Sequence, residues 1–289
     1  MVIDCHYHLD ERYLAIDELI KKMDEAGVEK TALMGAQIDP YPEPSRFLIS
    51  LLLPMLTIRA LRPVGKMFIA NFTQNGIKLM GKEYPLYIDP DNGPVFDAVK
   101  KHPDRFLGWI FVNPHGKKDQ VVEFEKWRKI KGVAGVKAHC FWNHHTPIEL
   151  KPVAERLASA GLPLIVHLGY GPEGDYGSLL KAVPELKLIM AHTGFPGYSD
   201  TWREIKGRKN VFVDLSQTSY VSPGTLRAAV KYLGVQRCLF GTDGPFGFRG
   251  KDGKFDYGLI KRRIEAAFPD AGTRRRLLGD NFREIAGVR

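Results

Sequence analysis

The sequence predicts a single (β/α)8 barrel, the TIM-barrel architecture of the α/β class, and three observations lead to that fold. Short apolar and β-branched runs alternate with longer amphipathic segments almost to the end of the chain, a pattern typical of parallel strands joined by helices. The strand candidates number eight, as a closed barrel requires. The 289 residues suit one domain, which we expect to span 1–289. A doubly wound sheet is the alternative.

The predicted strands are short, apolar and rich in β-branched residues. In order they are residues 1–5, 30–35, 105–113, 133–139, 162–168, 186–192, 211–216 and 237–243. The predicted helices lie between them, at residues 16–26, 94–101, 119–131, 149–160, 175–183, 199–207, 223–233 and 257–268. Several of these helices begin at Asp, Ser or Pro and end at Gly, residues that favour the first and last turns of a helix.

One connection is much longer than the others. About seventy residues separate the second and third predicted strands, and a structureless loop of that length is rare in a compact domain. We therefore expect residues 40–92 to form a helical cap, inserted where such segments shape an active site. The same cap is the predicted contact of a homodimer.

The composition is that of a globular protein, and it argues against several functional classes. Pro54, Arg59 and Lys66 interrupt the apolar stretch 47–70, so that stretch is too broken to span a membrane. The three cysteines are far apart and fit a reducing, cytoplasmic location. Much of the net charge of +9 lies on amphipathic segments late in the chain, which we interpret as solvated surface rather than a groove for nucleic acid.

The first predicted strand carries His6 and His8, which one residue separates. Alternate side chains of a strand point to the same face, so both imidazoles can meet one ion if that face is the barrel interior. The pair alone is weak evidence, because structural histidines are common.

Later strands end on residues of the same chemical type. His167 ends the fifth predicted strand, His192 the sixth and Asp243 the eighth, while Lys137 and His139 lie on the fourth. Barrel enzymes assemble their active sites at the C-terminal ends of the strands. A cluster of such side chains without an ion is costly to bury, which argues against a barrel that only binds a ligand or partner.

These motifs resemble the amidohydrolase superfamily, and more narrowly its amidohydrolase-related branch, which includes aminocarboxymuconate semialdehyde decarboxylase. The similar segments extend along the chain except for 40–92: DCHYHLD, DRFLGWIFVNP, GVKAH, LPLIVHLG, KLIMAHTGFPG, NVFVDLS, LFGTDGPF and LLGDNFREIAG. The resemblance implies a divalent metal held by four residues, His6, His8, His167 and Asp243. It also implies that His192 is a catalytic base or a further ligand.

The donor set agrees with this implication. Neutral imidazoles with one carboxylate suit Zn2+, the ion that we expect, and Mn2+ is an alternative. Such an ion lowers the pKa of a bound water from 15.7 to about 7 and so provides metal-activated water at neutral pH. Asp243 and His192 are the predicted catalytic residues, Asp243 taking the proton of the water and His192 polarising the substrate or positioning the water.

Lys137 distinguishes one-metal from two-metal sites. In two-metal members of the superfamily, a carbamylated lysine from the fourth strand bridges both ions. An unmodified ammonium group repels a second cation at short range. We therefore expect one ion, with Lys137 a contact for a substrate carboxylate or a structural residue and His139 behind the ligands. A second ion near Lys137, His139 or His192 is the alternative.

The predicted function is metal-dependent hydrolysis of a small carbonyl compound, namely an ester, lactone or amide, including one that carries an anionic carboxylate. Non-oxidative decarboxylation of an unsaturated or aromatic acid by a lyase is the alternative, because it needs the same ligands. Four residues a short distance past strand ends are candidates for substrate contact. They are Trp142, Phe195 and Phe246 as pocket walls and Arg249 as a partner for an anionic group.

A third reaction class shares the early motif. The segment VIDCHYHLDERY also resembles the start of TatD-type metal-dependent deoxyribonucleases, which have the histidine pair and a late aspartate. Those barrels carry a metal-bridging glutamate at the end of a middle strand, whereas the third and fourth predicted strands here end in FVNP and VKAH. A nuclease is therefore the minor alternative.

Overall fold

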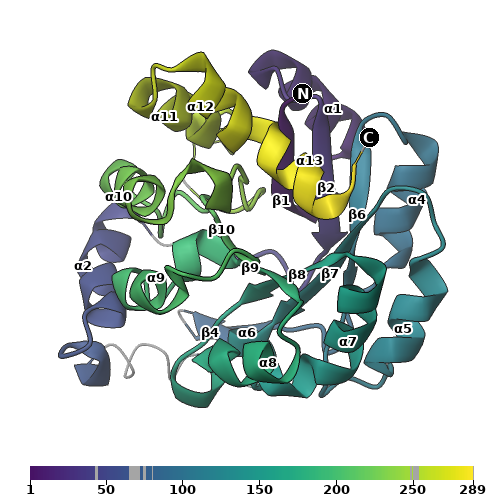
Figure 1. Ribbon diagram of the computed structural model, residues 1–289, viewed down its shortest axis with the longest axis horizontal. Coiled ribbons are helices and arrows are strands. Elements are labelled where there is room, and N and C mark those ends of the chain that lie inside the picture. Colours follow the sequence, from purple (N-terminus) through teal and green to yellow (C-terminus); the bar gives the residue numbers. More distant parts are fainter. Residues whose placement is uncertain are drawn as a thin grey trace.

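Eight parallel strands form one sheet that curls into a nearly closed barrel (Figure 1). The computed structural model describes residues 1–42, 45–64, 72–73, 76–79, 81–247, 249 and 254–288. The strands pair in the order β1 (Ile3–Leu9), β2 (Lys30–Gly35), β6 (Phe106–Phe111), β7 (Val133–His139), β8 (Pro163–His167), β9 (Lys187–Met190), β10 (Val211–Asp214) and β11 (Cys238–Leu239). Each overlaps one predicted strand, so the barrel prediction is confirmed.

The barrel closes where the chain beyond the last strand returns to the first. β11 is short, and the residues after it continue alongside β1. The N–H of Cys5 donates to the carbonyl of Phe240 at 3.0 Å, and the N–H of Asp243 donates to the carbonyl of His6 at 2.7 Å. This seam places Asp243 beside His6, although the two residues lie near opposite ends of the sequence.

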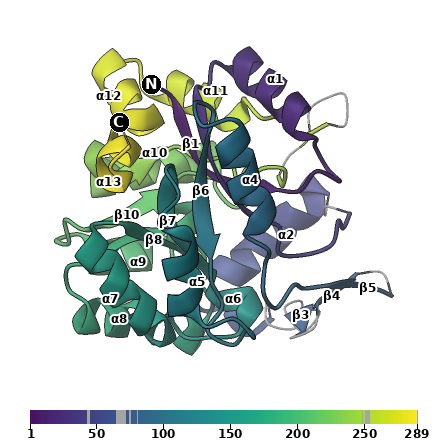
Figure 2. The same ribbon diagram turned by 90° about the vertical axis from the view of Figure 1, so that its right-hand side faces the viewer.

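Helices cover the outside of the barrel (Figures 1 and 2). Eight of them match the predicted helices: α1 (Ile16–Ala26), α4 (Gly93–Lys101), α5 (Gln120–Trp127), α7 (Lys151–Ala160), α8 (Tyr176–Ala182), α9 (Ser199–Ile205), α10 (Pro223–Leu233) and α11 (Leu259–Ala267). Shorter helices are α6 (Cys140–Asn143), α12 (Ala271–Arg275) and α13 (Asn281–Ala286). One apolar layer joins strands to helices, and a second cluster, which includes Trp109 and Phe282, fills the barrel interior. Within the described residues, no helix has the length and apolar character needed to cross a membrane.

A bulge in β1 determines which of its side chains face the interior. Between Asp4 and Tyr7, β1 contains one residue more than its partner β2. Ile3, before the bulge, and Cys5, within it, pack in the interior cluster, and after the bulge Tyr7 packs in the outer layer. The extra residue therefore leaves both His6 and His8 on the interior face, as bulges beside active sites commonly do.

A second irregularity has the same effect on β7. Its pairing with β6 shifts near the start of the strand. Gly135 there adopts a φ of 147°, and a Cβ at this position would lie 2.2 Å from the carbonyl oxygen of Pro163, so only glycine fits. Beyond the shift, Lys137 and His139 face the interior, with His139 in register with His167.

We expect residues 40–92, the insertion between β2 and β6, to form a helical cap, and the described part of it holds strands as well as helix. Its described residues form the helix α2 (Arg46–Thr57), a short helical stretch at 62–64 and a small antiparallel sheet of β3 (Phe72–Thr73), β4 (Gly76–Leu79) and β5 (Lys82–Pro85). β4 and β5 project from the barrel as a hairpin in Figure 2, and Gly81 between them has a φ of 79°, which suits a tight turn. The helical prediction rests on length alone and passes over this turn signal. The remainder of 40–92 lies outside the described residues.

Candidate metal centre

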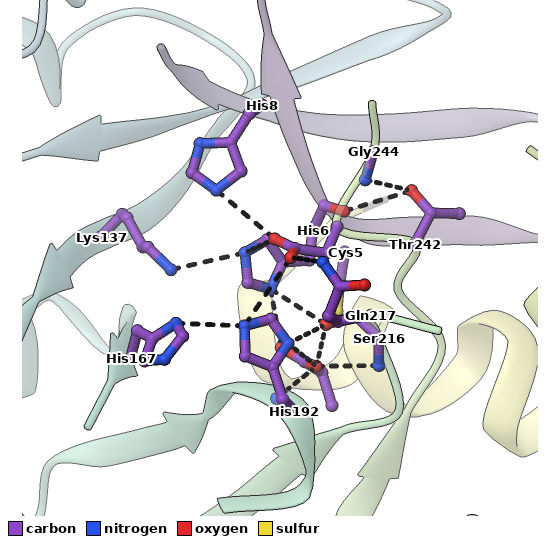
Figure 3. Close-up of polar contacts among 12 residues, drawn as sticks. Cys5, His6, His8, Lys137, His167, His192, Ser216, Gln217, Thr242 and Gly244 are labelled. Atoms are coloured by element: carbon purple, nitrogen blue, oxygen red, sulfur yellow. Dashed lines mark hydrogen bonds and ion pairs between the residues drawn. The ribbon is translucent and has the colours of Figure 1, made fainter. Parts of the chain in front are cut away.

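Buried polar side chains meet at the C-terminal ends of the barrel strands, and Figure 3 shows several of them turned toward one another. All seven that the sequence predicts at strand ends are here: His6 and His8 of β1, Lys137 and His139 of β7, His167 of β8, His192 after β9 and Asp243 after β11. None is more than 8% exposed. The strand-end positions therefore do converge in space.

Three of these side chains present ligand atoms to one point. The Nε2 atoms of His6 and His8 lie 3.0 and 3.5 Å from Oδ1 of Asp243. All three ligand atoms lie within 4.8 Å of one another, a spacing that allows one ion to contact each of them. They are three of the four ligands implied by the family resemblance.

Hydrogen bonds behind the two histidines fix which nitrogen carries the proton. Nδ1 of His6 lies 2.9 Å from Oδ2 of Asp214, and Nδ1 of His8 lies 3.3 Å from the carbonyl oxygen of Gly35. Both partners only accept, so each neutral ring has its proton on Nδ1 and turns the lone pair of Nε2 toward Asp243. With both rings neutral, three acceptors face one another, and Nζ of Lys137 lies 3.4 Å from one of them, Nε2 of His6; a divalent cation satisfies this arrangement. The residues present fit a metal ion.

The surrounding charges favour a cation beside His6. Burial and Lys137 lower the pKa of this histidine, but the carboxylates of Asp243 and Asp214 raise it above its ordinary value. Burial raises the pKa of Asp243, yet His192 and His6 hold it well below its usual range. A buried position that attracts a proton in this way also attracts a metal ion, because the two compete for the same lone pairs.

His167 is not in direct contact with the three converging ligand atoms, and His192 lies between it and Asp243. Its Nδ1 is 3.2 Å from Nε2 of His192, and that Nε2 is 3.8 Å from Oδ2 of Asp243. Burial lowers the pKa of both imidazoles, that of His192 to about 4, which leaves them neutral at pH 7. His167 thus contacts Asp243 through His192, and its role as a ligand stays a prediction.

Lys137 and His139 differ in their relation to the candidate metal position. Nζ of Lys137 lies 3.4 Å from Nε2 of His6, and burial lowers the pKa of Lys137 to about 8. His139 instead stacks on His167, with ring centroids 4.1 Å apart, and accepts a hydrogen bond at Nδ1 from the N–H of Trp142. Lys137 therefore borders the ligand atoms, whereas His139 supports His167.

Comparison with known protein families assigns the chain to one of them. A family model described as Amidohydrolase matches residues 82–285. The chain belongs to the amidohydrolase family. This assignment confirms the family that the motifs resemble, and no curated protein matches the sequence.

Solved structures support the fold of this amidohydrolase, and 105 chains match it. 5-Carboxyvanillate decarboxylase LigW from Sphingomonas paucimobilis is 14% identical with a TM-score of 0.62, over 100% of this chain and 99% of that chain. The putative 2-pyrone-4,6-dicarboxylic acid hydrolase from Pseudomonas putida is 18% identical with a TM-score of 0.61, over 99% and 97%. The TIM-barrel protein Bb4693 from Bordetella bronchiseptica is 14% identical with a TM-score of 0.65, over 99% of each chain. At these identities the likeness establishes the barrel fold alone.

Aromatic rings border the candidate centre of the amidohydrolase. Three that the sequence predicts as pocket walls each lie against a site histidine: Trp142 at 4.6 Å from His139, Phe195 at 6.0 Å from His167 and Phe246 at 5.6 Å from His8, between ring centroids. Tyr220, which the sequence does not single out, stacks on Phe195 at 4.4 Å. The centre therefore has flat apolar surfaces on both the His167 and the His8 side.

Arg249 lies elsewhere on the amidohydrolase. It is exposed and lines a cavity of about 150 Å³ together with Glu18, Lys22 and Lys254. None of the seven strand-end side chains lines that cavity. The structure thus does not bring Arg249 to the histidines, and its contact with an anionic substrate stays a prediction.

Three polar residues at the centre are missing from the sequence-based prediction. Asp214 contacts His6, the hydroxyl of Ser216 lies 2.8 Å from Nδ1 of His192, and the Nε2 group of Gln217 donates to Oδ2 of Asp243 at 2.9 Å. The rule that identifies His167, a polar residue ending an apolar strand, applies equally to Asp214 at the end of VFVD. Ser216 is the last residue of the predicted strand 211–216 and Gln217 follows it, and only the tertiary fold reveals their contacts.

Proposed function

We propose that this amidohydrolase is a metal-dependent hydrolase of a small carboxylic acid that contains an ester, lactone or amide bond. The observation that carries the proposal is the meeting of three unprotonated acceptors in a buried site: Nε2 of His6, Nε2 of His8 and Oδ1 of Asp243. Burying acceptors against one another is unfavourable unless a cation lies between them. A purely structural role leaves this arrangement unexplained.

A single zinc ion is the metal that we propose, held by His6, His8 and Asp243 with His167 as the fourth ligand. Neutral imidazoles and one carboxylate are ligands that zinc favours. When bound, the ion supplies Lewis acidity and lowers the pKa of water. The ammonium group of Lys137, 3.4 Å from Nε2 of His6, supports a single ion because it repels a second one.

The side chains around this position can hold and move a proton. Nδ1 of His192 donates to the hydroxyl of Ser216 at 2.8 Å, so its Nε2 carries the lone pair of the ring, and Nδ1 of His167 lies 3.2 Å from that Nε2. That Nε2 lies 3.8 Å from Oδ2 of Asp243, which Gln217 holds by a hydrogen bond of 2.9 Å. The pair therefore accepts a proton from water at these atoms and returns it to the leaving group.

The aromatic walls support an unsaturated or aromatic acid as the substrate. Phe195 and Tyr220 stack nearly parallel, with an interplanar angle of 10°, and Phe195 stands 6.0 Å from the ring of His167. Flat rings of this kind pack best on flat substrates. Two of the structural neighbours are named for reactions of 5-carboxyvanillate and 2-pyrone-4,6-dicarboxylic acid, both carboxylic acids. Lys137 offers a buried positive charge for such a carboxylate.

Decarboxylation of the same kind of acid is the second candidate. Lys137 and the three converging acceptors form a site for a carboxylate as well as for a carbonyl group, and the fold resembles that of LigW. In that reaction the pair of His192 and Asp243 takes a proton from water and gives it to the carbon that CO2 leaves.

Metal analysis and a substrate panel test the proposal together. Purified protein should hold about one equivalent of a divalent ion. His6→Ala should lose it, whereas His102→Ala, a histidine outside the centre, should keep it. The panel contains 2-pyrone-4,6-dicarboxylate and 5-carboxyvanillate, with products identified by mass spectrometry. Gain of one water supports the hydrolase and release of CO2 supports the decarboxylase. Turnover that survives removal of every metal ion contradicts both.

We also propose a homodimer with segment 40–92 at its contact. No side chain of α2 is buried, and Phe47 is 74% and Leu51 47% exposed. Apolar surface gathered in this way marks an interface. Light scattering should therefore give twice the 32.6 kDa of one chain, and Phe47→Asp should give the monomer.

Three buried, unpaired cysteines support our proposal of a cytoplasmic location.

A further inference from the structure

Asp214 is a fully buried carboxylate that contacts both His6 and His192, and the proposed reaction does not yet use it. Its Oδ2 accepts from Nδ1 of His6 at 2.9 Å. Its Oδ1 accepts from the N–H of His192 at 2.9 Å, from the N–H of Ser216 at 3.0 Å and from the hydroxyl of Ser216. One side chain thus connects the first barrel strand with the turn after β9; Figure 3 labels three of the residues that it contacts, His6, His192 and Ser216.

The hydroxyl of Ser216 links this carboxylate to the ring of His192. An ionised carboxylate only accepts hydrogen bonds, so the hydroxyl proton points to Oδ1 of Asp214. The hydroxyl oxygen is then the acceptor for Nδ1 of His192, 2.8 Å away. The neutral ring of His192 must therefore carry its proton on Nδ1.

We propose that Asp214 is a positioning residue that sets the tautomer of two histidines at once, His6 directly and His192 through Ser216. Both rings then present the lone pair of Nε2 to the candidate centre. The rings lie nearly parallel, 5.2 Å apart at an angle of 21°. What each lone pair does rests on the proposed function: the one on His6 holds the metal, and the one on His192 takes the proton.

The two oxygens of Asp214 have different partners, and this allows the two histidines to be separated by mutation. Oδ1 receives three donors, whereas Oδ2 receives His6 alone among the described residues. In Asp214→Asn the amide oxygen therefore takes the Oδ1 position, and the NH2 group faces His6. A donor opposite Nδ1 forces His6 to carry its proton on Nε2. The hydrogen bonds to Ser216 and His192 remain.

Ser216→Ala has the opposite selectivity. It removes the hydroxyl between Asp214 and His192, which also lies 3.4 Å from Nδ1 of His6, and leaves the shorter hydrogen bond of 2.9 Å between Asp214 and His6 in place. Nδ1 of His192 lies 4.0 Å from Oδ1 of Asp214, too far for a direct hydrogen bond. His192 then populates both tautomers.

The experiment measures the ring nitrogens and the metal affinity rather than turnover. Nitrogen NMR of metal-free protein labelled in histidine, at alkaline pH where the rings are neutral, reports which nitrogen is protonated. Competition with a chelator reports the affinity for Zn2+. In wild type, His6 and His192 should both carry the proton on Nδ1. Asp214→Asn should reverse His6 alone and weaken zinc binding by about 10–100-fold. Ser216→Ala should change His192 alone and leave zinc affinity unchanged.

Matched controls come from similar groups on the surface. Asp119 accepts main-chain N–H groups at the start of α5, and the hydroxyl of Ser178 bonds to Asp175 at the start of α8. Asp119→Asn and Ser178→Ala should alter neither histidine. Protonation of His6 or His192 on Nε2 in the wild type overturns the inference, as does a loss of zinc affinity in Ser216→Ala equal to that in Asp214→Asn. The wild-type spectrum decides the tautomers even if a variant fails to fold. No readout uses a substrate, so failure of the proposed hydrolysis is a separate result.

Discussion

The hydroxyl of Thr242 donates to the carboxylate of Asp4 at 2.6 Å across the seam of the barrel. Asp4 also accepts from the N–H groups of Thr242 and His6, at 2.9 and 3.0 Å. One buried carboxylate thus ties the first strand to the residue that precedes Asp243. The separation between His6 and Asp243 in the candidate centre depends on this link.

Thr242→Val tests the seam, because it removes the hydroxyl while keeping the size of the side chain. One oxygen of Asp4 loses its donor, and we expect the free energy of unfolding to fall by about 1–3 kcal/mol. Zinc affinity should fall as well, since Asp243 is the next residue. Urea denaturation and chelator competition measure the two effects. Thr242→Ser keeps the hydroxyl, so its free energy of unfolding and its zinc affinity should stay close to those of the wild type. Equal losses in Thr242→Val and Thr242→Ser would show that the hydroxyl does not hold the seam.

His167 decides whether the proposed zinc has three or four protein ligands. We expect His6→Ala and His167→Ala each to weaken zinc binding by more than the roughly 10–100-fold that loss of an outer hydrogen-bonding partner costs. His139→Ala is the control, because its ring stacks on His167 without reaching the three converging ligand atoms. Competition titration measures all three affinities. Wild-type affinity in His167→Ala would reduce the ligand set to His6, His8 and Asp243.

Gly135→Ala tests the irregularity that turns Lys137 inward. A Cβ here meets the carbonyl oxygen of Pro163 at 2.2 Å, and the φ of 147° is strained for any other residue. We expect a loss of about 2–4 kcal/mol in unfolding free energy. Gly161→Ala is the control, since Gly161 also has positive φ but no atom within 4 Å of a Cβ, and it should lose about 1 kcal/mol. Thermal unfolding measures both losses of stability. Equal losses in Gly135→Ala and Gly161→Ala would show that the contact with Pro163 does not matter.

Phe195→Ala tests the aromatic wall. Loss of the ring that stacks on Tyr220 should raise KM for an aromatic or pyrone acid by about three- to tenfold, the equivalent of one aromatic contact, with a smaller change in kcat. Steady-state kinetics with the active substrate of the panel measures both constants. Phe195→Tyr keeps the ring and should keep KM. A fall in kcat at constant KM would assign Phe195 to the reaction step instead.

The course of the barrel could be predicted because each strand is a compact apolar run bounded by polar or glycine residues. The predicted bounds 30–35 and 133–139 coincide with β2 and β7. The segment 40–92 has no such periodicity, so its length alone suggested helices, and the hairpin of β4 and β5 was missed. Loop residues such as Tyr220 carry no signal of their own, because their place beside Phe195 depends on how the loops after β9 and β10 fold.

The histidine pair was predicted correctly from an incomplete picture of its strand. Strict alternation places His6 and His8 on one face and Cys5 on the other. In the structure Cys5 packs in the interior as well, because the bulge between Asp4 and Tyr7 adds a residue. A bulge is a property of two paired strands, and the sequence of one strand does not reveal it.

The seam also bears on how the protein is made. Asp4 and Thr242 are 238 positions apart in the sequence, so the candidate centre joins two segments of which the one with Asp4 leaves the ribosome well before the other. Contacts of such long range form late in folding. A nascent chain that ends before Asp243 has the histidine pair without its carboxylate. The metal should therefore bind after the barrel has closed. Because it binds only the closed form, it then shifts the folding equilibrium toward that form.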